Sequence, residues 1–311
     1  MADIKEQMYP DIDLLKIILK DKSTGLFIRW ATNNYESYGS SYKAEQQIFP
    51  ELIAGDNIEI VKPRVKKDLV NQQRRTRDKA EVFTPSWICN QQNNLIDEAW
   101  FGRRDVFNAI SGNEWITNNE KIAFPNGKMK SWKHYVDARR LEISCGEAPY
   151  LVSRYDSVNG RFIPVRERIG LLDRKLRIVS ENTSGEDEWY EWAIRAYQSI
   201  YGYEYQGDNV FLARENLLNT FIDNIKDLYG HGPSLKQIKK IATIISWNIW
   251  QMDGLTMTAP FSEKIPLYKQ ITLFDILNGT VDKGDPVPCK IFDWRAKHSL
   301  EFRKMLNREG K

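Results

Sequence analysis

The feature that most constrains the fold is an alternation of short strand-like segments and longer helix-like segments between residues 139 and 254. Segments 139–147, 200–204 and 248–254 have the composition of strands that run into a turn or an acid, and segments 188–199, 208–229 and 234–246 have helical spacing. This alternation is typical of a parallel sheet with helices on its faces. Ligands of such sheets bind at the carboxyl ends of the strands. The pattern therefore predicts an α/β fold with a site at that edge.

The 311 residues are enough for about two domain-sized units. A strand-like run, Ile58–Val61, precedes a basic segment at 62–79 that is typical of an exposed helix or arm, and we place a boundary near residue 80. Residues 1–80 are thus expected to form an N-terminal region and residues 81–311 the main α/β domain. Within it we predict an insertion near 156–182 and a C-terminal tail at 261–311.

Cysteine and histidine usage argues against dedicated metal chemistry. Cys89, Cys145 and Cys289 are widely separated, and the three histidines are far apart. Neither set has the short spacings of zinc or thiol-exchange motifs. Cys145 alone is better explained as a small buried residue than as a nucleophile, because no Cys-His pairing is evident. No segment approaches the ~18 continuous apolar residues of a membrane span. We expect a soluble protein of the reducing cytoplasm, with no metal and no membrane partner.

Positive charge is segregated along the chain. The net charge is only +3, but residues 62–79 carry +6 and residues 161–177 and 290–311 carry +4 each. Such runs can neutralise phosphates and release counterions, which drives binding to nucleic acids. They are equally compatible with solvated helix faces. Under the first interpretation, the predicted DNA contacts are Arg74, Arg75, Arg77, Arg174 and Lys175.

Several residues at the predicted strand ends suit a nucleoside ligand. Gly146 permits a tight turn in which backbone amides face a ligand. Glu204 ends a predicted strand, where a carboxylate can accept hydrogen bonds from ribose hydroxyls. Asp253 offers an acceptor to an amino group. Further upstream, Thr84-Pro85 is a favourable helix start, with Pro expected at the first helical position.

In four ordered pieces over about residues 80–260, the chain resembles the S-adenosylmethionine-dependent amino-methyltransferases of DNA, especially the adenine-specific enzymes of restriction-modification systems. The pieces are Glu81-Val82-Phe83-Thr84-Pro85, Leu141 to Leu151 with its Ser144-Cys145-Gly146 turn, Tyr201-Gly202-Tyr203-Glu204, and Asn248 to Leu255. The resemblance implies a Rossmann-like class I methyltransferase sheet with an N-terminal extension and a basic C-terminal tail. It also implies that S-adenosylmethionine is held by Thr84, Pro85, Glu142, Cys145, Gly146, Glu204 and Asp253.

The catalytic residues are not identified by the resemblance. Adenine-specific members carry an Asn/Asp-Pro-Pro-Tyr/Phe tetrad that grips a flipped base. Segments 274–280 and 285–288 each match only part of it, and Cys289 to Trp294 reads as a short strand that ends in an acid and an aromatic residue, without prolines. Trp294 itself suits plain packing.

Three functions are therefore compatible with the sequence. The first is an adenine methyltransferase-like protein, either diverged or completed by a partner such as a restriction or specificity subunit. The second is a non-catalytic subunit that binds cofactor and DNA. The third is a nuclease component, because Asp156 together with Asp173-Arg174-Lys175 faintly matches the acids and lysine of metal-dependent nucleases.

Overall fold

The computed structural model describes residues 11–67, 84–263 and 285–306. Its centre is a parallel sheet of three strands, β3 (Arg140–Glu142), β4 (Ile200–Glu204) and β5 (Ile249–Gln251), in the order β3-β4-β5. The register pairs Glu142 with Gly202 and Glu204 with Gln251, so all three strands end at one edge. The predicted mixed α/β class and the three predicted strands are confirmed.

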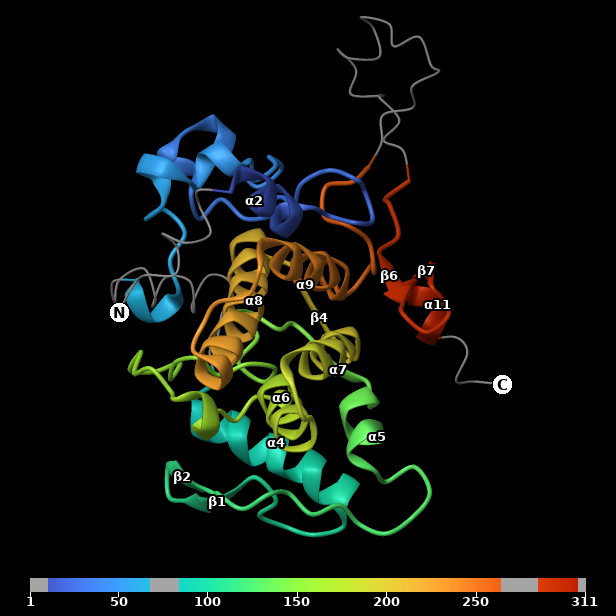
Figure 1. Ribbon diagram of the computed structural model, residues 1–311. Helices are drawn as coiled ribbons and strands as arrows, with labels where there is room; N and C mark the ends of the chain where they lie inside the picture. Colours follow the sequence, from blue (N-terminus) through green and yellow to red (C-terminus); the bar gives the residue numbers. More distant parts are fainter. Residues whose placement is uncertain (1–10, 68–83, 264–284, 307–311) are drawn as a thin grey trace, which may run out of the picture.

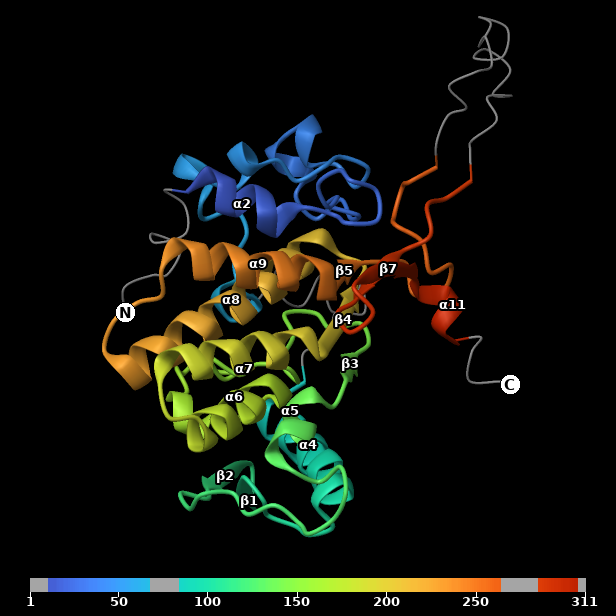
Figure 2. The ribbon, with the colours of Figure 1, turned by 45° about the vertical axis from the view of Figure 1, so that its right-hand side comes forward.

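Two helices connect each pair of neighbouring strands, as parallel pairing requires long crossovers. Helices α6 (Leu171–Asn182) and α7 (Glu186–Gln198) lead from β3 to β4, and helices α8 (Gly207–Tyr229) and α9 (Leu235–Asn248) lead from β4 to β5. The predicted helices at 188–199, 208–229 and 234–246 are confirmed to within two residues. Figure 1 shows α6 to α9 as neighbours, and Figure 2 shows them together on one side of the strands.

Local sequence explains where these helices begin and end. Helix α9 starts at a capping box, in which the Ser234 hydroxyl accepts from the Gln237 amide (3.4 Å) and the Gln237 side chain accepts from the Ser234 amide (2.8 Å). Helix α8 ends at Gly230, whose φ of 74° is easily reached only by glycine. The middle of α8 is buried on nearly all sides, which makes it the central helix of the core.

The N-terminal region packs on α8 and α9. It contains α2 (Ile12–Leu19), capped by the Asp11 carboxylate, followed by single 3₁₀ turns. These turns are η1 (Glu36–Tyr38), η2 (Ser40–Tyr42), η3 (Pro50–Leu52), η4 (Gly55–Asn57) and η5 (Arg64–Lys66). Residues of α2 share one hydrophobic core with α8 and α9. The boundary near residue 80 stays a prediction, but the packing on its two sides is continuous.

Residues 84–137 cover the far side of α6. Helix α4 (Ser86–Phe101) begins directly after Pro85, which occupies the cap position, one residue before its expected place. A hairpin of β1 (Asn108–Ser111) and β2 (Glu114–Thr117) follows, and then α5 (Trp132–Asp137). The second half of the expected insertion at 156–182 is α6 itself, a helix of the core; the first half contains the short turn η6 (Val165–Glu167).

The end of the described chain forms an antiparallel hairpin of β6 (Lys290–Asp293) and β7 (His298–Glu301), followed by α11 (Phe302–Leu306). In Figure 2 these elements lie to the right of the strands, opposite α6 to α9. The short strand predicted at 289–294 is confirmed, but it pairs with β7 and not with the parallel sheet. The strand-like run Ile58–Val61 forms turns, so that local expectation was wrong. None of the helices in the described ranges has the length and apolarity needed to cross a membrane.

Candidate functional site at the carboxyl edge of the sheet

Three of the predicted residues meet where β3, β4 and β5 end. Backbone pairing continues beyond the strands, with the Cys145 amide donating to the Tyr203 carbonyl (2.8 Å) and the Met252 amide donating to the Glu204 carbonyl (3.0 Å). Gly146, Glu204 and Asp253 each lie within one residue of these two hydrogen bonds. Segments about 50 residues apart in the sequence are thus joined at one edge.

Glu204 fastens the turn after β3 to the end of β4. Its Oε2 accepts from the Gly146 amide (3.0 Å) and its Oε1 from the Gln206 amide (3.0 Å). Gly146 has a φ of 52°, which a residue without a side chain adopts at least cost. Only 8% of Glu204 is exposed, and this burial raises the pKa of its carboxyl above the ordinary value. A carboxylate has about four acceptor sites, so these two bonds leave acceptor capacity for a ligand.

Glu142 contributes a carboxylate oxygen that lacks a partner. Its Oε1 accepts a long hydrogen bond from the Tyr150 amide (3.4 Å), while its Oε2 is buried and has no hydrogen-bond partner within the described residues. Burial raises the pKa of this carboxyl well above the ordinary value, and the charge of Glu204 adds to the shift. Buried acceptors are rarely left unpaired. This oxygen is therefore suited to a donor on a bound molecule.

Thr84 and Pro85 lie beside the same turn. The Thr84 carbonyl accepts from the Ser157 hydroxyl (2.8 Å), and the Thr84 side chain lies close enough to the Tyr150 phenol to influence its pKa. Burial raises the pKa of the Tyr150 phenol, and Glu142 lies near enough for its charge to raise that pKa further. The first two pieces of the resemblance are therefore neighbours in space, although they are about 60 residues apart in sequence.

Asp253 holds its own loop with one oxygen and leaves the other available. Its Oδ1 accepts from the amides of Leu255 (2.8 Å) and Thr256 (3.2 Å), which is an Asx turn. Its Oδ2 makes no hydrogen bond within the described ranges. Tyr205, which the sequence analysis did not single out, lies beside it: burial raises the pKa of the Tyr205 phenol, and the charge of Asp253 raises it further. With 37% of its surface exposed, Tyr205 offers an aromatic surface next to the acceptor.

The N-terminal region covers part of this edge, an arrangement that no local sequence pattern indicates. The Gln251 side chain accepts from the Arg29 amide (2.8 Å) and donates to the Arg29 carbonyl (2.8 Å). The Gly207 amide donates to the Trp30 carbonyl (3.1 Å), and a Cβ on Gly207 would lie 1.9 Å from the Arg29 oxygen. The end of β5 and the start of α8 are therefore closed, and the accessible part of the edge lies toward Gly146, Tyr205 and Asp253.

Cys145 is a packing residue. It is 1% exposed, and a Cβ on Gly202 would lie 3.2 Å from its Sγ, so the small thiol and the glycine fit together. Burial raises the pKa of this thiol well above the ordinary value, which opposes formation of a thiolate nucleophile. Its predicted place in the turn is confirmed, whereas a direct contact with cofactor stays a prediction.

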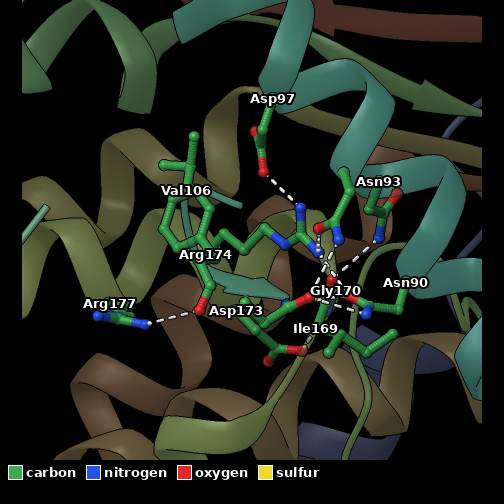
Figure 3. Close-up of polar contacts among 12 residues, drawn as sticks. Asn90, Asn93, Asp97, Val106, Ile169, Gly170, Asp173, Arg174 and Arg177 are labelled. Atoms are coloured by element: carbon green, nitrogen blue, oxygen red, sulfur yellow. Dashed lines mark hydrogen bonds and ion pairs between the residues drawn. The ribbon is translucent and has the colours of Figure 1, made fainter. Parts of the chain in front are cut away.

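The predicted phosphate contacts of Arg174 and Lys175 were wrong, because both side chains are buried. Arg174 is 1% exposed; it forms an ion pair with Asp97 and donates to the side-chain oxygens of Asn90 and Asn94 (2.8 Å each). Figure 3 shows Arg174 pointing from α6 to Asn90 and Asp97 on α4. Lys175 is also 1% exposed and donates to the Val136 carbonyl (2.9 Å) and the Ser199 hydroxyl (2.6 Å). The other predicted contacts, Arg74, Arg75 and Arg77, lie outside the described residues.

The acids considered for a nuclease perform structural roles. Asp173 accepts through one oxygen from the amides of Ser153 (2.8 Å) and Gly170 (3.0 Å), which joins the loop after β3 to the start of α6. Asp156 caps its own turn. In the three described ranges, no three His, Cys, Asp or Glu side chains gather as metal ligands would.

The acid and the aromatic residue at the end of β6, which stood nearest to the tetrad, are engaged in local contacts. Segment 274–280 lies outside the described residues. At the end of β6, Asp293 accepts from the amides of Arg295 (2.9 Å) and Ala296 (3.0 Å), and the Trp294 indole donates to Asn248 (2.8 Å), so both side chains serve local structure. No family model, curated protein or solved structure matches the chain. Function must therefore be inferred from the geometry of the edge itself.

Proposed function

We propose that this protein binds S-adenosylmethionine at the carboxyl edge of its sheet and acts as the cofactor-binding part of a DNA adenine methyltransferase of a restriction-modification system. One observation carries the proposal: four segments distant in sequence place acceptor oxygens of Glu142, Glu204 and Asp253 along one edge, with Thr84 beside them. Two of these oxygens, Glu142 Oε2 and Asp253 Oδ2, have no hydrogen-bond partner within the described residues.

The acceptors match the donors of this cofactor. Glu204 would accept from the ribose hydroxyls and Asp253 Oδ2 from the adenine amino group, with Tyr205 against the ring face. The ammonium group at the methionine end would meet Glu142 Oε2 next to Thr84. The ligand carries a sulfonium and an ammonium, and cations placed beside the three acidic side chains would favour their ionised forms, so the site also complements the ligand's charge.

When bound, the cofactor supplies an activated methyl group for direct displacement by the target amino group. The chain's contribution is to hold and orient the adenosyl and methionine ends, because positioning two reactants can remove much of the barrier to such a transfer. The Gly146 turn, fixed by Glu204, would set the position of the methionine end. The groups that grip the target base are not identified in the described residues, and a partner chain could supply them.

Calorimetric titration with S-adenosylhomocysteine tests the site, and the key variant is Asp253→Asn. Asparagine keeps the Oδ1 that makes the turn and replaces the available Oδ2 with a donor, so the fold is retained while the acceptor is lost. We expect affinity to fall by about tenfold or more, as for loss of a hydrogen bond to a charged group. The matched control is Asp293→Asn, in which the same kind of Asx turn lies at the end of β6.

Two outcomes would refute the site: no binding by the wild type at about 1 mM ligand, a dissociation constant of little biological use, or equal affinity of wild type and Asp253→Asn. Methyl transfer to unmethylated DNA, measured with and without the products of neighbouring genes, then separates the two functional forms. Transfer under either condition supports the methyltransferase. Binding without transfer under both conditions supports a non-catalytic subunit, which the unidentified tetrad also favours.

A further inference from the structure

The open long side of the sheet, formed by β3, has features of a docking site for an extended polypeptide. The Arg140 amide donates to the Ser199 carbonyl of the β4 segment (2.9 Å), so the amide of the next residue, Leu141, points away from β4. Strand β3 is an end strand in the described sheet, and the Leu141 amide and carbonyl form no hydrogen bond there. Unpaired strand groups are templates for another strand.

Apolar surface continues from this edge across one face of the sheet. Leu141 is 45% exposed and Ile143 is 66% exposed. Leu141 also lines a cavity of about 150 Å³ between the sheet and the β6–β7 hairpin, together with Tyr201, Trp250, Ile291, Leu300 and Met305. The cavity therefore reaches the exposed edge, where it can receive an apolar side chain of an added strand.

The charges around this cavity indicate the chemistry of the occupant. Arg139, Arg140 and Asp293 line it, and an adjoining small cavity is lined by Arg139, Arg195, Arg295 and Asp137. Four arginines thus face two aspartates. Arg139 pairs with Asp293 (3.4 Å), and Arg195 and Arg295 share Asp137 (3.7 and 3.4 Å). Arg140 pairs with no carboxylate in the described chain, and its guanidinium donates only to the Arg139 carbonyl (3.2 Å).

From the unpaired edge, the apolar cavity and the excess of arginine, we infer that β3 accepts an acidic, extended segment of a partner protein as a fourth strand. Its backbone would pair with Leu141, an apolar side chain would enter the cavity, and a flanking carboxylate would meet Arg140. Nucleic acid is disfavoured because the wall of the cavity is mainly apolar. This inference goes beyond the proposed function and does not depend on cofactor binding.

Defined peptides test the inference on the full chain. The probe is a fluorescent peptide of alternating valine and glutamate, compared with a valine-lysine peptide, a valine-glutamate peptide interrupted by proline, and an oligothymidylate of about 20 nucleotides. Fluorescence anisotropy gives the affinity, and hydrogen exchange gives the exchange rates of the backbone amides of residues 141 and 143. We expect micromolar binding of the acidic peptide, binding at least about tenfold weaker for the other two peptides, and slowed exchange at Leu141.

Variants locate the contact. Arg140→Glu should weaken binding of the acidic peptide by about tenfold and strengthen binding of the lysine peptide. The control Arg103→Glu, at an exposed position beyond the end of α4, should change neither affinity. The inference is overturned if the acidic peptide does not bind, if both charged peptides bind equally, or if Leu141 exchanges as before. Displacement of the peptide by oligothymidylate, or a dimer in sedimentation that Arg140→Glu dissociates, would assign the edge to nucleic acid or to a second copy and would equally refute it.

Discussion

The buried position of Arg174 leads to a quantitative prediction for Arg174→Met. Methionine fills a similar space but leaves the Asp97 carboxylate buried, since Asp97 is 1% exposed and would keep only the Tyr135 hydroxyl (2.7 Å) as a strong donor. Removing one partner of a buried ion pair typically costs about 3–5 kcal/mol. An unfolding entropy of about 2.1 cal/mol/K per residue gives about 0.65 kcal/mol/K for 311 residues. A loss of about 4 kcal/mol should therefore lower Tm by about 6 °C.

Thermal and urea unfolding of four proteins provide the measurement: wild type, Arg174→Met, Asp97→Asn and the double variant. Asparagine retains an acceptor for Tyr135, so the double variant should recover about 2 kcal/mol of the loss relative to the sum of the single variants, as expected for residues in contact. The surface control is Arg103→Met. A loss below about 1 kcal/mol combined with a marked fall in DNA affinity would refute the reasoning, because it would place Arg174 in solvent and on phosphates.

Three further predictions follow from the edge of the sheet and its surroundings. Gly207→Ala places a methyl group against the Arg29 carbonyl and should lower the free energy of unfolding by about 1–3 kcal/mol. The control is Gly185→Ala, which has open space around it and should lower this free energy little. Thermal unfolding compares the two variants, and equal losses of stability would contradict the close contact. Burial raises the pKa of Glu142, so its carboxyl binds a proton more tightly in the folded state, and stability should fall as pH rises from the ordinary Glu range through the raised value. In urea unfolding, the stability of Glu142→Gln should not fall over this pH range, and at neutral pH the variant should be more stable than wild type. A variant whose stability depends on pH as that of wild type does would refute the prediction. Burial alone would raise the pKa of Asp223, but its ion pairs with Arg154 and Arg168 lower it below the ordinary Asp value. The ionised carboxylate therefore stabilises the fold above the ordinary Asp pKa, and this stabilisation is lost as pH falls through the lowered pKa. Asp223→Asn should therefore lose stability at neutral pH and match wild type near the acid limit, and a constant difference at all pH values would contradict the sign.

The elements that sequence predicted well are those with a local signal. Segment 200–204 is a short run bounded by a helix and an acid, and segment 208–229 repeats apolar residues at helical spacing, so each could be recognised without its neighbours. The meeting of Gly146, Glu204 and Asp253 at one edge followed from the parallel pairing of these strands. In contrast, Ile58–Val61 has strand-forming residues but no neighbouring strand to pair with, and it forms turns.

The burial of Arg174 and Lys175 could not be read from their own charge run, because lysine and arginine usually lie at the surface. A signal was present elsewhere: Asn90, Asn94 and Asp97 recur at helical spacing along α4, which places a polar stripe on one face. Such a stripe on a helix between core segments suggests buried hydrogen bonding. Its partner, however, lies about 80 residues downstream, and nothing local specifies it.

The contact of Arg29 with Gln251 joins residues 222 positions apart, and this separation has a consequence during synthesis on the ribosome. At a rate of about 5–20 residues per second, the apolar side of α2 would wait roughly 11–44 s for α8, α9 and β5 to emerge and cover it. Leu14, Leu15 and Ile18 would stay exposed to the crowded cell during this interval. The nascent chain should therefore depend on chaperones that shield N-terminal hydrophobic segments, and slowing translation before residue 251 should lower the yield of native protein.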